Sequence, residues 1–174
     1  MTNTPHPRRL SQQERLLLGI LRAGNFRRLP AWKRTKYEFL LEHGWRYRPS
    51  RLPKHIKRGE KNECFNNAFE LALNDHSLTY CEGFVLNRTG KLPIHHAWVT
   101  DGTGRAIDNT LVESASAYFG VPFNTAFLCR YYLKTKDITS MLDDYEHHWP
   151  LLRRLGDKPE KWLEPKGCGL ARLT

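Results

Sequence analysis

From residue 62 onward the apolar residues of the chain follow two spacings in turn, first that of a helix and then that of strands. Residues 64–75 place apolar side chains three, four, seven and eight positions after Phe65, which predicts a helix with one buried face. Turn signals at residues 87–90 and 102–104 separate shorter runs with the composition of strands. These strands are predicted at residues 78–86, 93–101, 104–108 and 125–135. A helix that opens a run of antiparallel strands predicts an α+β fold, with the helix packed on a short antiparallel sheet.

Two helices are predicted before this core. In residues 10–24, Ser11 and Glu14 have the spacing of a capping box, in which each side chain bonds the backbone of the other residue. Residues 31–44 carry an apolar face at helical spacing. A glycine ends each segment, as is common at the C-terminus of a helix.

The regions between and after these elements divide the chain into two parts. Prolines, a glycine and clustered basic residues indicate a linker or a long loop at residues 45–63. A last helix is predicted at residues 137–149. We therefore expect a basic helical region with its linker at residues 1–61. Residues 62–174 are expected to form the α+β core, with a C-terminal helix.

Composition narrows the class of protein. A chain of 174 residues with 40% hydrophobic content is long enough for one domain with a buried core and too apolar to be disordered throughout. No stretch approaches the ~18 apolar residues of a membrane span, and the N-terminus lacks the pattern of a signal peptide. The cysteines at positions 64, 81, 129 and 168 show no metal-binding spacing. We interpret them as reduced thiols and expect a cytoplasmic protein without membrane contact.

The net charge of +10 is concentrated in the N-terminal third. Residues 1–61 hold 16 Lys and Arg against 4 Asp and Glu, whereas residues 62–174 hold 12 against 14. Such asymmetry favours a polyanionic partner, either nucleic acid or an acidic protein, although charged helices facing solvent also account for it. No RNA-recognition or zinc-finger motif is present. The candidate polyanion-binding residues are Lys33, Arg34, Lys36, Arg48, Arg51, Lys54, Lys57 and Arg58.

Three residues have the chemistry of a cysteine enzyme. Cys64 falls in the first turn of its predicted helix, where the helix dipole favours a thiolate. His96 lies near the start of one predicted strand and Asp108 near the end of the next, so that the carboxylate could orient an imidazole beside the thiol. Each residue also has an ordinary interpretation, as a buried cysteine, a packed histidine or a turn aspartate.

The turn between these two strands decides whether His96 and Asp108 share a face. An odd-numbered loop, such as three residues centred on Gly102, places the two side chains opposite each other. A two-residue loop at residues 102–103 would turn Asp108 to the other face. Glycines at positions 102 and 104 favour the odd loop, because such loops need a residue with left-handed backbone.

The order of these residues resembles the core of transglutaminase-like and papain-like cysteine enzymes. The matching segments, "CFNNAFELAL", "YCEGFVL", "HHAWVTDGTGRAIDNT" and "YFGVPF", lie within residues 62–128 and look similar to small bacterial and phage proteins of that type. The resemblance implies that Cys64 is the nucleophile, His96 the base and Asp108 the residue that orients the base. The glutamine that papain-like enzymes place before the nucleophile is absent. Asn62 or the Cys64 N–H would bind the oxyanion instead.

The neighbours of these residues complete the candidate site. Adjacent strand residues point to opposite faces, so only one of His95 and His96 can face Cys64, and the resemblance favours His96. Trp98 shares the face of His96 and is a candidate substrate contact. Glu82, an acidic residue in an apolar strand, contacts substrate, pairs with a basic side chain or is an edge-strand charge.

The sequence therefore predicts a cysteine-dependent acyl-transfer enzyme of protease, amidase, deamidase or transglutaminase type, acting on a protein or peptide without a cofactor. The alternative is a non-enzymatic binding module on a papain-like shell, whose basic N-terminal helices contact nucleic acid or an acidic protein. A metal site at His95, Cys81 and His147 or His148 lacks any ligand spacing, so no metal is expected.

Overall fold

The structure is a computed structural model and describes residues 9–24, 29, 33–88, 92–136, 138–153, 158–164 and 169–172. Its α-helices are α1 (Gln12–Ala23), α2 (Lys36–His43), α3 (Cys64–Asn74) and α4 (Thr125–Thr135). Its strands are β1 (Trp45–Pro49), β2 (Thr79–Leu86), β3 (Pro93–Thr100), β4 (Arg105–Ile107), β5 (Ala117–Pro122) and β6 (Ala171–Arg172). This content confirms the predicted α+β class. Among the described residues, no helix has both the length and the apolar character that crossing a membrane requires.

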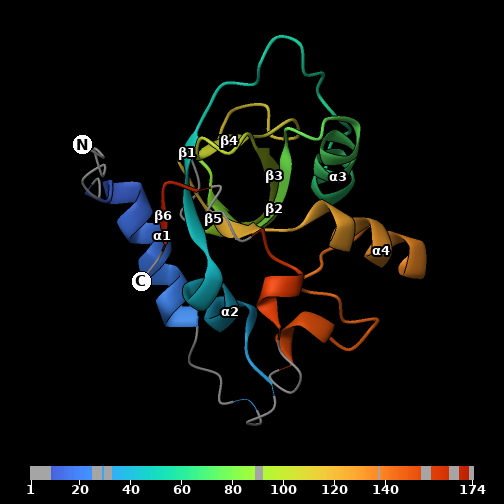
Figure 1. Ribbon diagram of the computed structural model, residues 1–174. Helices are drawn as coiled ribbons and strands as arrows, with labels where there is room; N and C mark the ends of the chain where they lie inside the picture. Colours follow the sequence, from blue (N-terminus) through green and yellow to red (C-terminus); the bar gives the residue numbers. More distant parts are fainter. Residues whose placement is uncertain are drawn as a thin grey trace, which may run out of the picture.

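The strands form a single sheet that closes into a barrel (Figure 1). Their order is β4-β3-β2-β5-β1-β6, and each neighbouring pair in this row is antiparallel. β1 also pairs with β4 in parallel, which joins the two ends of a row of five strands. β6 lies outside the ring, beside β1. The short antiparallel sheet predicted from the sequence is thus a closed barrel with one parallel seam.

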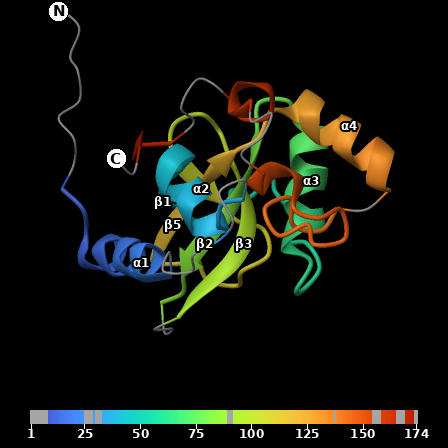
Figure 2. The same cartoon turned by 90° about the horizontal axis from the view of Figure 1, so that it is seen from below.

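The two faces of the barrel wall bury two separate clusters. Alternate residues of β2, such as Cys81 and Val85, share the interior with Trp98 and Tyr118. The other face belongs to a larger core that includes side chains of all four helices. Figures 1 and 2 show α3 beside β3 and β2, whereas α1 and α2 lie on the side of β5. The helices therefore cover the outside of the barrel, and its inside is filled by side chains.

A pair of glycines allows β2 and β5 to approach closely. Gly83 and Gly120 are register partners in these strands. A Cβ atom at Gly83 would lie 2.0 Å from the carbonyl oxygen of Phe119, and one at Gly120 would lie 2.5 Å from the ring of Trp98. Since no side chain fits in either place, the curvature of the wall here depends on glycine.

The N-terminal helix forms as predicted, with both bonds of the capping box between Ser11 and Glu14. The second helix is shorter than the predicted segment 31–44 because Thr35 caps it, accepting the N–H of Glu38, so that the helix begins at Lys36. Residues 45–49, expected to belong to a linker or loop, instead form β1.

Residues 125–135 were predicted as a strand, and this was wrong, because they form α4. The Asn124 side chain accepts the N–H of Phe127 and so caps the helix. Phe127 and Tyr131, four residues apart, both pack against the core, and Leu128 between them is buried. Helical spacing and a cap therefore decide the structure of a segment that is also rich in aromatic residues.

The helix predicted at residues 137–149 is also wrong. Over its described part, 138–149, this segment forms turns. The N–H groups of Met141 and Leu142 bond to the Glu82 carboxylate, and the N–H of Asp143 bonds to the Ser140 hydroxyl. Because side chains bond N–H groups that a helix would need, the turns replace it.

We expect Gly83→Ala to destabilise the protein by roughly 1–3 kcal/mol or more, because the added methyl group overlaps the backbone of β5. Gly19→Ala is the matched control, since nothing lies within 4 Å of a Cβ there and the residue is inside α1. The control should gain about 0.5–1 kcal/mol. Urea denaturation of both variants measures the difference, and equal stabilities would contradict the close approach of the strands.

Candidate active site

Cys64 is the first residue of α3, as predicted, and is buried. Glu63 before it forms no side-chain cap, and Asn62 has a left-handed backbone with φ of 68°. Among the described residues, no acceptor bonds the N–H of Cys64. Since the N-terminus of a helix carries partial positive charge, negative charge on the sulfur or on an oxygen beside this N–H is stabilised there.

His96 and Asp108 meet inside the barrel wall. His96 Nε2 lies 2.8 Å from Asp108 Oδ2, and both side chains are buried. β4 ends at Ile107 and pairs with β3 only at Val99 and Thr100. The histidine therefore lies beyond the last β3–β4 pair, and the aspartate directly follows the end of β4.

The register of this hairpin differs from the predicted one. Val99 pairs with Ile107, which centres the connection on Thr103 rather than on Gly102. The expected direct pairing of His96 with Asp108 is therefore wrong. The pair nearest the turn, Thr100 and Ala106, encloses residues 101–105, which is an odd number, so the side chains of His96 and Asp108 keep the same face and can meet diagonally. Gly102 and Gly104 both have left-handed backbone, as expected for such a turn.

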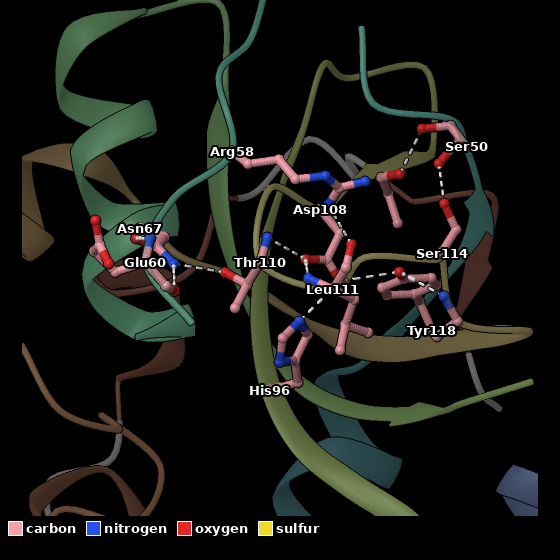
Figure 3. A network of polar contacts seen from close by, with 12 residues as sticks. Ser50, Arg58, Glu60, Asn67, His96, Asp108, Thr110, Leu111, Ser114 and Tyr118 are labelled. Atoms are coloured by element: carbon pink, nitrogen blue, oxygen red, sulfur yellow. Dashed lines mark hydrogen bonds and ion pairs between the residues drawn. The ribbon is translucent and has the colours of Figure 1, made fainter. Parts of the chain in front are cut away.

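Asp108 accepts hydrogen bonds from four groups (Figure 3). The N–H groups of Thr110 and Leu111 reach Oδ1 at 2.9 and 3.0 Å, and the Tyr118 hydroxyl donates to Oδ2 at 3.0 Å. Burial alone would raise the pKa of Asp108, but the hydrogen bond and charge of His96 and these N–H groups lower it. The carboxylate is therefore held ionised inside the protein.

The Cys64 side chain also acts on the electrostatics of His96. Burial alone would lower the pKa of His96, but the hydrogen bonds and charges of Asp108 and Cys64 raise it from 6.5 to about 9. The histidine is thus an imidazolium at neutral pH, placed between a carboxylate and a thiol. We call Cys64, His96 and Asp108 the triad.

Tyr118 and Asn67 support the triad and were not predicted from the sequence. Tyr118 accepts the N–H of Ala115 and donates to Asp108. Asn67, one turn after Cys64, bonds both the N–H and the carbonyl of Glu60 and also the Thr110 hydroxyl. It therefore joins the segment before Cys64 to the loop after Asp108. The only sign in the sequence was a polar residue within an apolar helix.

Glu82 faces away from the triad, toward the helices. Its carboxylate is fully buried and accepts bonds from Tyr80, Ser140 and two backbone N–H groups. His95 Nε2 also lies 3.0 Å from it. The two neighbouring histidines thus point to opposite faces of β3, where His95 lies beside Glu82 and His96 beside Asp108.

The two other residues predicted to contact the substrate or the oxyanion, Trp98 and Asn62, differ in their burial. Trp98 shares the face of His96 but is fully buried, with its ring edge-on to those of Tyr47 and Tyr118. It therefore fills the barrel interior. Asn62 is exposed at the turn before Cys64.

The candidate polyanion-binding residues fall into two groups. Arg34 is buried and bonds Glu42, whereas Lys36 pairs with Asp143 and Lys33 lies over the Trp149 ring. The other five are exposed and lie in β1 or between β1 and α3: Arg48, Arg51, Lys54, Lys57 and Arg58. The exposed positive charge is therefore concentrated in the segment that leads to Cys64.

No group of three or more potential metal ligands occurs among the described residues. Cys81 and His95, which a metal site with His147 or His148 would need as joint ligands, lie on opposite faces of the sheet. Cys64, Cys81 and Cys129 are free thiols, and Cys168 lies outside the described residues. No protein-family model, curated protein or solved structure matches the chain.

The His96–Asp108 pair should give a distinctive titration. The stabilisation from the raised pKa of His96 is fully present below about 6.5 and is lost as the pH rises through about 9. In Asp108→Asn the carboxylate charge is gone, so the pKa of His96 should fall and this loss of stability should disappear. NMR titration of the imidazole signals, assigned with His96→Gln, measures the change. A wild-type His96 that titrates near 6.5 would contradict the buried ion pair.

Proposed function

We propose that this protein is a cysteine-dependent acyl-transfer enzyme in which Cys64 is the nucleophile. The observation that carries the proposal is the position of His96, whose Nε2 lies 2.8 Å from Asp108 Oδ2 and whose pKa is raised by both Asp108 and Cys64. A thiolate beside an imidazolium that a carboxylate orients is the arrangement from which cysteine enzymes attack carbonyl carbon.

The first half of the reaction forms an acyl-enzyme. The Cys64 thiolate attacks the substrate carbonyl carbon, and a carbon–sulfur bond forms while the π electrons move to the oxygen. The N–H of Cys64 at the start of α3 is the donor for this oxyanion. The His96 imidazolium then gives its proton to the leaving nitrogen, the carbon–nitrogen bond breaks, and a thioester remains.

The second half regenerates the enzyme. Neutral His96 takes a proton from a water molecule or an amine as that molecule attacks the thioester. The thiolate leaves, which restores the pair of thiolate and imidazolium. The same residues serve hydrolysis and transfer, so the proposal covers both outcomes for a protein or peptide substrate.

We further propose that the core belongs to the papain-like and transglutaminase-like type. In support, the nucleophile opens a helix packed against strands of the sheet. The histidine lies in β3 and the aspartate directly follows β4, so the chain order is Cys64, His96, Asp108. The free thiols of Cys64, Cys81 and Cys129 support a reducing, cytoplasmic environment.

The test uses two probes of the thiol, iodoacetamide and the acyl donor p-nitrophenyl acetate. At neutral pH, Cys64 should be alkylated faster than the more exposed Cys129, and mass spectrometry should find a transient acetyl group on Cys64. His96→Gln should slow both reactions by about tenfold or more, because the base is removed.

His95→Gln is the matched control, since His95 is adjacent in sequence but faces Glu82. This variant should react as the wild type does. If His96→Gln and His95→Gln react at the same rate while circular dichroism shows both folded, Cys64 is not activated by His96 and the proposal fails.

A further inference from the structure

An open groove of about 950 Å³ lies beside the triad but does not contain it. Its walls come from α1, from the end of β2, from the segment after β1 and from residues 112–116. None of the three triad residues lines it. We call it the arginine groove, because Arg51, Arg58 and Arg88 line it.

The charge of the arginine groove favours an anionic ligand. Glu113 is the one carboxylate that lines it among the described residues. Within the described parts of the chain, neither Arg51 nor Arg88 forms an ion pair, and both are exposed. A guanidinium presents parallel N–H groups that match a carboxylate, so unpaired arginines in one groove form a binding site for acidic side chains.

The groove and the triad share a wall. Arg58 donates to the carbonyl of Leu111 at 2.5 Å and to that of Val112 at 2.7 Å. The N–H of Leu111 in turn donates to Asp108 (Figure 3). On the same wall, Ala115 lines the groove and bonds Tyr118, which donates to Asp108. A ligand in the groove therefore lies against the loop that carries the triad carboxylate.

The other lining residues favour a peptide over a nucleic acid. The groove includes the aliphatic side chains of Leu16, Leu52 and Val112, of which Val112 is 80% exposed. No aromatic side chain lines the groove among the described residues, although unpaired bases bind mainly by stacking on aromatic rings. Aliphatic and cationic groups together match a segment of mixed acidic and aliphatic residues.

We propose that the arginine groove binds an acidic segment of the polypeptide substrate and thereby selects substrates for the triad. This inference rests on the proposed function, because it assigns the groove's ligand to the substrate of Cys64. Arg51 and Arg88 are specificity-determining residues in this scheme, and Arg58 both binds the segment and holds the loop at residues 111–112.

The experiment measures fluorescence anisotropy of a fluorescein-labelled peptide of alternating Glu and Leu at low salt. The same peptide with Gln in place of Glu, and a single-stranded DNA of similar length, are compared. The acidic peptide should bind more tightly than both, and the double variant Arg51→Gln, Arg88→Gln should weaken its binding by about tenfold or more.

The matched control is Lys54→Gln, Lys57→Gln, which removes the same charge from exposed residues that lie in the segment of Arg51 but do not line the groove. It should change binding much less. An equal loss of affinity for the acidic peptide in both double variants, or no binding of this peptide to the wild type, would overturn the proposal. Tighter binding of the DNA, lost in the arginine variant, would assign the groove to nucleic acid and would also overturn the proposal.

Failure of the groove and failure of the nucleophile give different results. Cys64→Ala should still bind the peptide, because the thiol does not line the groove. If the peptide binds but Cys64 is not activated, the proposed enzymatic function is wrong, and the ligand of the groove cannot be its substrate. If Cys64 is activated but the peptide does not bind, only the proposed role of the arginine groove is wrong.

Discussion

Inside the barrel, a single carboxylate holds together elements that are distant in the chain. Asp108 accepts bonds from its own loop, from β5 through Tyr118 and from β3 through His96. A buried charge is stable only while such donors are in place, so these elements cannot move independently. Asn67 extends the network to α3 by bonding Thr110. The position of Cys64 relative to His96 therefore depends on the hydrogen bonds that the Asp108 carboxylate accepts.

A second buried carboxylate, that of Glu82, accepts hydrogen bonds on the opposite face of the same sheet. Glu82 bonds the turns at residues 140–142 and lies beside His95, as Asp108 bonds its loop and His96. The wall of the barrel thus carries two negative groups that point in opposite directions. Each one fixes a segment without regular secondary structure, because N–H groups that would otherwise be unpaired find an acceptor there.

Local chemistry explains which parts of this structure could be predicted from the sequence. The capping box of α1, the start of α3 at Cys64 and the shared face of His96 and Asp108 follow from spacing within a few residues. The structure at residues 138–149 depends on Glu82, more than fifty positions earlier, and no local pattern indicates it. No local pattern indicates the role of Tyr118 either, since its bond to Asp108 requires the closed barrel.

The parallel pairing of β1 with β4 has a consequence for the order in which the chain folds. β2 and β3 are close in sequence and pair along their whole lengths, so their hairpin closes a short loop. In the described part of the chain, β1 pairs with β4, β5 and β6, all of them much later in the sequence. During synthesis, residues 45–49 must therefore wait, unpaired, until the chain has been made to at least residue 107. β1 is thus one of the first strands to be synthesised and one of the last to pair, and its pairing with β4 closes the barrel.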